Sequence, residues 1–147
     1  MADFCQHGSI ATMHDLGTIQ RDQLERMLER YVVNCQVGLV LPVTAGDMRA
    51  DPFARIMAEL AAVRYVSHIV VVLGVAPAVE DYREAVAKVR VLGDRARVLW
   101  TDGARVQAVY QQLNDAGLAA TTPGKGRSVW TAFGYLLGDP RLEVFAL

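Results

Sequence analysis

Apolar residues along this chain follow two spacings, one typical of buried strands and one typical of amphipathic helices. Short continuous apolar runs at residues 37–41, 69–73 and 98–100 predict strands that are buried on both faces. Elsewhere apolar residues recur every three or four positions, which predicts helices with one apolar stripe. The predicted helices cover residues 21–31 and the stretches around residues 53–60, 82–89, 106–113 and 129–137, and a last strand follows at residues 143–147.

Strands that alternate with helices of this length predict crossover units and a mostly parallel sheet. Helices then cover both faces of the sheet, so the expected fold class is α/β with Rossmann-like αβα layers. We expect the first strand to end at Pro42 and a loop to run from Val43 to about Asp51. Pro52 suits the first turn of the next helix, and Gly117 suits the left-handed position that follows a helix end.

Length, composition and charge fit one folded domain. A chain of 147 residues with 52% hydrophobic residues is long enough and apolar enough to bury a core. The expected organisation is a single domain over residues 1–147 with an N-terminal extension at residues 1–20, and residues 1–17 lack periodicity and predict a packed coil. A net charge of -1 argues against binding to the phosphate backbone of nucleic acid.

The cysteines, histidines and N-terminus predict a cytoplasmic protein without metal. Cys5 and Cys35 fit neither a disulfide framework nor a zinc spacing, so we expect reduced thiols. His7, His14 and His68 show no metal-ligand spacing. No apolar segment approaches the roughly 20 residues that cross a bilayer, and the N-terminus lacks the positive charge of a signal peptide.

Candidate chemistry lies in the loops that follow the predicted strands, because ligands of open parallel sheets bind beyond the carboxyl ends of the strands. Asp47, Asp102 and Arg105 are the polar candidates in these loops. Asp102 is followed by glycine, and that pair is also typical of a plain turn or a helix cap. Trp100 and Trp130 lie in apolar stripes, which predicts that both belong to the core.

The Pro-Gly-Lys-Gly-Arg stretch at residues 123–127 has the residue types of an anion site. Gly124 and Gly126 allow close approach of a ligand, a helix N-terminus offers free N–H groups, and Lys125 and Arg127 add positive charge. The stretch is not a Walker A loop, since no strand pattern precedes it. A solvated helix start is the alternative interpretation, and these residues alone leave both open. The absence of G-x-S-x-G and G-x-G-x-x-G motifs argues against a hydrolase or a nicotinamide enzyme.

Several motifs together resemble one enzyme family, along nearly the whole chain. They are residues 1–4 with Thr12, His14, Leu16 and Gly17, the first strand with Pro42, residues 97–103, and the Pro-Gly-Lys-Gly-x-x-x-Trp pattern at residues 123–130. The last pattern is the most specific, because it combines a spacing with an unusual residue. The chain resembles the N-terminal half of GT-A glycosyltransferases, in the branch of retaining enzymes that contains glucosyl-3-phosphoglycerate synthase and mannosylglycerate synthase.

The resemblance implies a nucleotide site and no catalytic residue in this chain. In such enzymes the first strand ends in a proline, which Pro42 matches. An acidic residue that holds the base and ribose of the nucleotide follows within a few residues. Asp47 is the nearest candidate for it here, although glutamate is more usual. The second strand commonly ends in an aspartate that contacts the nucleotide, whereas this chain has Gly74. The Gly124-Lys125-Gly126 loop lies on the nucleotide side, which makes Lys125 the best single contact for base or diphosphate. The implied nucleotide-binding residues are Pro42, Asp47, Gly74, Gly124, Lys125 and Gly126.

The resemblance also implies a metal-binding Asp-x-Asp motif directly after the fourth strand, where this sequence stops. We therefore expect a truncated chain that is inactive alone, with Mg²⁺ or Mn²⁺ held only by the full-length relative. That relative would transfer a sugar from a UDP- or GDP-linked donor to a small acceptor such as glycerate or phosphoglycerate. Apolar surface that a missing half would cover predicts poor solubility or self-association into a homo-oligomer. A non-enzymatic α/β binding or regulatory module is the alternative, favoured by the Gly74 departure.

Overall fold

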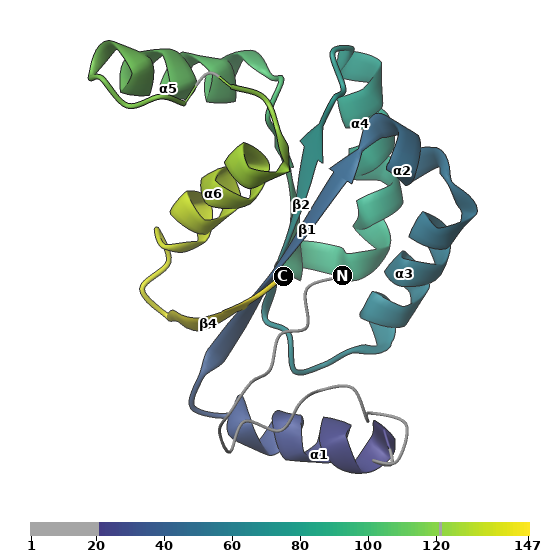
Figure 1. Cartoon of the computed structure of the whole chain (residues 1–147). Helices are drawn as coiled ribbons and strands as arrows, with labels where there is room; N and C mark the ends of the chain where they lie inside the picture. Colours follow the sequence, from purple (N-terminus) through teal and green to yellow (C-terminus); the bar gives the residue numbers. More distant parts are fainter. Residues whose placement is uncertain (1–20, 121) are drawn as a thin grey trace, which may run out of the picture.

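Four parallel strands form the central sheet of the computed structural model, which describes residues 21–120 and 122–147 (Figure 1). The strand order is β3-β2-β1-β4. The strands are β1 (Gln36–Thr44), β2 (His68–Gly74), β3 (Ala96–Trp100) and β4 (Leu142–Ala146). The helices are α1 (Arg21–Tyr31), α2 (Ala45–Arg49), α3 (Asp51–Ala62), α4 (Val79–Val89), α5 (Ala104–Asp115) and α6 (Lys125–Leu136), with a 3₁₀ helix η2 (Arg90–Arg95) before β3. The predicted α/β class with a parallel sheet is confirmed.

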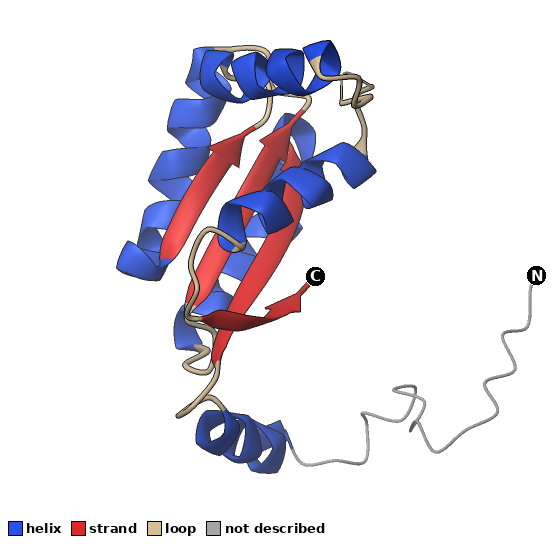
Figure 2. Ribbon diagram, turned by 90° about the vertical axis from the view of Figure 1, so that its left-hand side faces the viewer, coloured by secondary structure: helices blue, strands red, loops and turns tan. Residues whose placement is uncertain are grey.

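Helices cover the two faces of the sheet with separate apolar clusters (Figures 1 and 2). Because side chains alternate along a strand, Ile69, Val71 and Leu73 of β2 face α2, α3 and α4, while Val70 and Val72 face α6. All five residues are essentially inaccessible to solvent. The continuous apolar run therefore does predict a strand buried on both faces, as parallel sheets require.

The carboxyl ends of three strands lie at one height. Thr44 of β1 pairs with Gly74 of β2, and Leu73 pairs with Trp100 of β3. The edge strand β4 ends lower, because its Ala146 pairs with Leu39 of β1. The loops after β1, β2 and β3 therefore meet at the carboxyl-terminal edge of the sheet. β4 stops before it reaches this edge.

The predicted end of the first strand is wrong by two residues. β1 continues through Pro42 to Thr44, and the short helix α2 occupies most of the stretch that was predicted to be a loop. Pro42 disturbs the ladder little, because at this height β1 pairs with β2 and no longer with β4. The side chain of Thr44 then accepts a hydrogen bond from the backbone N–H of Asp47 and starts the helix.

Two helix boundaries are as predicted. Pro52 lies in the first turn of α3. Gly117 has φ +82°, and the N–H groups of Gly117 and Leu118 donate to the carbonyls of Asn114 and Leu113. This pattern is a Schellman motif, which ends α5.

Trp130 is not a core residue, contrary to the prediction, since its side chain is 56% exposed. The face of α6 that covers the sheet is centred on Ala132 and Leu136, and Trp130 lies to one side of that face. The apolar stripe of α1 is likewise exposed at Met27, Leu28 and Tyr31.

Some expectations concern residues outside the described part of the chain. These are the packed coil at residues 1–17, Cys5, His7, His14 and the family motif at the N-terminus. Within the described part, Cys35 is a half-buried free thiol, and none of the helices is long and apolar enough to cross a membrane.

Candidate functional site

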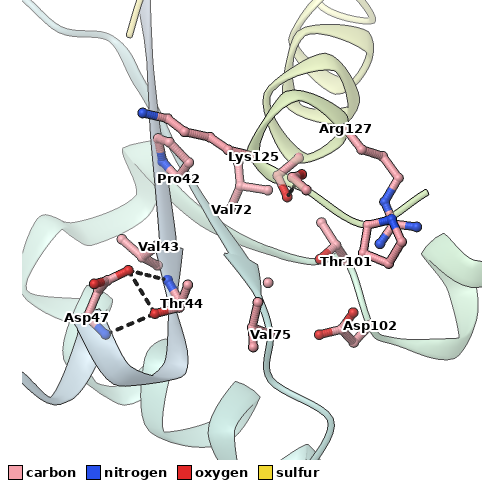
Figure 3. Close-up of a pocket in the computed structure, with 14 residues that line it drawn as sticks. Pro42, Val43, Thr44, Asp47, Val72, Val75, Thr101, Asp102, Lys125 and Arg127 are labelled. Atoms are coloured by element: carbon pink, nitrogen blue, oxygen red, sulfur yellow. Dashed lines mark hydrogen bonds between the residues drawn. The ribbon is translucent and has the colours of Figure 1, made fainter. Parts of the chain in front are cut away.

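A pocket of about 450 Å³ opens where β1, β2 and β3 end and α6 begins (Figure 3). Open parallel sheets place their ligands at this edge. The walls come from the end of β1 and the start of α2, the end of β2, the turn after β3, and the first turn of α6. The lining residues are Pro42, Val43, Thr44, Asp47, Val72, Gly74, Val75, Thr101, Asp102, Pro123, Gly124, Lys125, Arg127 and Ser128.

The α6 wall of the pocket carries positive charge. Gly124 caps the helix in an extended conformation without a side-chain hydrogen bond to the first turn, and the N–H groups of a first helical turn have no partners within the helix. Lys125 and Arg127 line this side of the pocket. The positive end of the helix and two cationic side chains therefore lie together, an arrangement that suits an anion.

Contacts with α5 fix the position of the α6 start. The Arg127 guanidinium lies over the ring of buried Tyr110, 4.4 Å from its centroid. The hydroxyl groups of Tyr110 and Thr131 are 2.7 Å apart and hydrogen-bonded. Two points of contact one turn apart on α6 hold its N-terminus against the neighbouring helix.

The opposite wall carries Asp47, whose carboxylate is tied to the end of β1. One carboxylate oxygen accepts hydrogen bonds from the Thr44 backbone N–H at 2.9 Å and from the Thr44 hydroxyl at 2.8 Å. Together with the reciprocal bond to the Asp47 backbone N–H, these contacts form a capping box (Figure 3). The hydrogen bonds from Thr44 lower the pKa of Asp47 below its ordinary value.

We expect Asp47→Ala to lower the melting temperature by about 2–4 °C at neutral pH, because the Thr44 N–H and hydroxyl lose the carboxylate that completes the capping box of α2. The lowered pKa of Asp47 means that its ionised form favours the folded state, so this stabilisation is present above the ordinary pKa near 3.8 and is lost as the pH falls below it. The difference from the wild type should therefore be constant between about pH 6 and 8 and shrink below about pH 4.

Thermal melts between pH 3 and 8 measure this difference, with Glu59→Ala as the matched control because Glu59 is an exposed carboxylate on α3. A pH-independent effect of Asp47→Ala, or an equal effect of Glu59→Ala, would contradict the capping role.

Hydrogen bonds to the N–H and to the carbonyl of Ala76 hold the loop after β2. The Asp102 carboxylate accepts a hydrogen bond from the Ala76 backbone N–H at 2.8 Å. The indole Nε1–H of Trp100 donates to the Ala76 carbonyl at 2.7 Å. The side chain of Asp102 therefore joins two loops rather than capping α5, whose N-cap is Gly103 without a side-chain bond.

Gly74 lies where two hydroxyl groups approach the backbone, and a side chain at this position would crowd them. A Cβ atom at this position would lie 3.2 Å from the Thr101 hydroxyl and 3.4 Å from the Ser128 hydroxyl. Thr101 is buried and donates to the Leu73 carbonyl, so it has little freedom to move. Ser128 was not predicted from the sequence, and Thr101 was predicted only as part of the loop after the third strand. The small residue at position 74 is the signal that could have suggested their approach.

The pocket residues do not fit a metal ion. Its two carboxylates, Asp47 and Asp102, already accept hydrogen bonds from the Thr44 and Ala76 N–H groups. Among residues 21–120 and 122–147, no group of three His, Cys, Asp or Glu side chains could hold a metal ion.

The structure brings five of the six predicted nucleotide-binding residues to this pocket. Pro42, Asp47, Gly74, Gly124 and Lys125 line it, and Gly126 lies in the first turn of α6 without lining it. Arg105, another polar candidate, lines a separate, mostly apolar pocket beside β3. That the six residues bind a nucleotide stays a prediction.

Comparison with known proteins finds relatives along the whole chain. It is 33% identical over 147 residues to a glucosyl-3-phosphoglycerate synthase from Persephonella marina, covering 100% of this chain and 36% of the relative. It is 30% identical over 133 residues to a protein of the same name from Methanococcoides burtonii, covering 90% of this chain and 32% of the relative.

The chain thus spans about a third of the length of the curated relatives that it matches. No protein-family model and no solved structure matches it. The similarity confirms the resemblance that the motifs predicted: this chain is homologous to a part of proteins named glucosyl-3-phosphoglycerate synthase.

Proposed function

We propose that this chain is the nucleotide-sugar-binding part of a glycosyltransferase. The observation that carries the proposal is the pocket at the sheet edge, with a cationic helix start on one wall and strand ends on the other. The homologous proteins are named for the synthesis of glucosyl-3-phosphoglycerate, which supports a glucosyl donor and a phosphoglycerate acceptor. The family resemblance adds that the donor is a nucleoside diphosphate sugar, UDP- or GDP-linked, and that glycerate is the other candidate acceptor.

The charges of the pocket suggest how such a donor lies in it. The diphosphate is the anionic part, and the free N–H groups of α6 with the Lys125 ammonium suit it. Figure 3 shows the Lys125 side chain extending over Pro42, two residues before the end of β1, so it can reach a ligand between the two walls. Among the described residues, no ion pair engages Lys125, and its charge is available to a ligand.

Calorimetric titration of the 147-residue chain with UDP and with GDP tests the proposal. We expect one of the two to bind, and Lys125→Ala to weaken that binding about tenfold, the amount typical of one charge-assisted contact. Affinity for the wild type should fall as salt is raised, and this dependence should be smaller for Lys125→Ala, because an ionic contact has been removed. The titrations are run in EDTA, since the pocket's own donors do not form a metal site.

Arg55→Ala is the matched control, since it removes an exposed positive charge from α3, on the other face of the sheet. It should change nucleotide affinity less than about twofold, within the usual effect of a remote surface charge. Binding of neither UDP nor GDP would overturn the proposal and favour the alternative of a non-enzymatic α/β binding module.

A further inference from the structure

Val75 lies in the pocket in a backbone conformation that valine rarely adopts. Its φ is +51°, in the left-handed region, where a β-branched side chain crowds its own backbone. In the described part of the chain, Val75 is the only residue other than glycine that has a positive φ. Its side chain is 75% exposed and lines the pocket between Thr44 and Asp102 (Figure 3).

The surrounding structure holds Val75 in this conformation. Ala76 is fully buried, and its N–H and its carbonyl are bound by Asp102 and Trp100. On the other side, Gly74 ends β2 and pairs with Thr44. Because the residues on both sides of Val75 are fixed, its backbone has no freedom to relax. Strain of this kind persists only where neighbouring residues determine the backbone conformation.

Packing within the domain does not explain a valine at this position. The side chain contributes little to the core, because most of it faces solvent. A glycine would adopt the same backbone without strain. The apolar side chain is therefore an unfavourable choice for the free protein, and a ligand that covers it would offset the cost.

The chemistry of the pocket indicates which part of a ligand would cover the Val75 side chain. Lys125, Arg127 and the free N–H groups lie along α6 and suit phosphate. Val75 lies at the end of β2 and has no group that could bind phosphate. We propose that Val75 is a binding residue that packs on the flat apolar face of the nucleobase, an inference that rests on the nucleotide site proposed above.

Three substitutions of Val75 separate a ligand contact from backbone effects. Val75→Gly removes both the strain and the contact, and we expect its melting temperature to rise by about 2–4 °C after the extra chain entropy of glycine is included. Val75→Ala removes the contact but keeps the restricted backbone of a non-glycine residue. Val75→Thr keeps the branched shape.

Nucleotide affinity is measured by calorimetry with the diphosphate and the monophosphate of the base that the wild type binds. Val75→Gly and Val75→Ala should each bind about fivefold more weakly, because part of a valine side chain is no longer buried by the ligand. Val75→Thr should bind within about twofold of the wild type. The loss should be equal for diphosphate and monophosphate, whereas Lys125→Ala should weaken the diphosphate more.

Unchanged affinity of Val75→Ala and Val75→Gly, in a chain whose wild type binds nucleotide, would overturn the Val75 contact alone. A wild type that binds no nucleotide would overturn the proposed function together with this inference. A loss confined to the diphosphate would also contradict the contact, since it would place Val75 beside the phosphates.

Discussion

Replacing Gly103 with alanine is expected to lower the free energy of unfolding by about 2–3 kcal/mol, because the added Cβ atom overlaps a rigid ring. That atom would lie 2.6 Å from Cε3 and 3.0 Å from Cδ2 of Trp100. The indole cannot move aside without cost, since its ring stacks on Tyr82 at a centroid distance of 5.4 Å and its N–H binds the Ala76 carbonyl. Urea unfolding at neutral pH measures the change.

Gly134→Ala is the matched control, with the opposite expected sign. Gly134 lies within α6, and a Cβ atom there would meet no other atom within 4 Å. Alanine in a helix interior is more stable than glycine by roughly 0.5–1 kcal/mol. If Gly103→Ala were neutral or stabilising, the Trp100 ring or the loop after β3 would have to shift more easily than the contacts of Trp100 with Tyr82 and Ala76 indicate.

Helix and strand periodicity was enough to predict the fold class but not every element. The run at residues 69–73 became β2, because a strand buried on both faces needs apolar residues at every position. The five-residue helix α2 has no periodic pattern to reveal it. Its sequence signal is local, a threonine followed three residues later by an acidic residue, as at Thr44 and Asp47.

Periodicity also predicts that a helix has an apolar face without saying which residues the sheet will cover. In α6 the small Ala132 and the larger Leu136 face β1 and β2, while Trp130 and Leu137 of the predicted stripe face solvent. The selection depends on where the helix lies over the sheet, and that position is set by contacts distant in sequence, such as the bond between Tyr110 and Thr131.

The location of the pocket was predictable, because parallel strands bring their carboxyl ends to one edge whatever their sequence. The contacts that single side chains make were not predictable. Asp47 was predicted to be a ligand contact, and the structure adds that its carboxylate binds Thr44. Val75 lies in the predicted ligand loop after the second strand, but its conformation gave no signal, since a left-handed φ at valine follows from how Asp102 and Trp100 hold Ala76.

Replacing Trp100 with phenylalanine is expected to lower the free energy of unfolding by about 2 kcal/mol, because the Ala76 carbonyl loses its 2.7 Å hydrogen bond and the ring becomes smaller. Ala76 is fully buried, so water replaces the indole N–H poorly. The substitution also releases one side of the loop that positions Val75. If Val75 packs on the nucleobase, as proposed, Trp100→Phe should weaken nucleotide binding as well as the fold.

Trp130→Phe separates this effect from a general cost of losing an indole. Trp130 is 56% exposed, so the same substitution there should change the free energy of unfolding by less than about 0.5 kcal/mol. Urea unfolding of both variants, with calorimetric titration of nucleotide beside it, measures the two effects. A Trp100→Phe variant that is destabilised but binds nucleotide like the wild type would show that the hydrogen bond to Ala76 stabilises the fold without positioning the loop. A variant with wild-type stability would contradict the role of that bond altogether, because the buried carbonyl would then have found another partner at no cost.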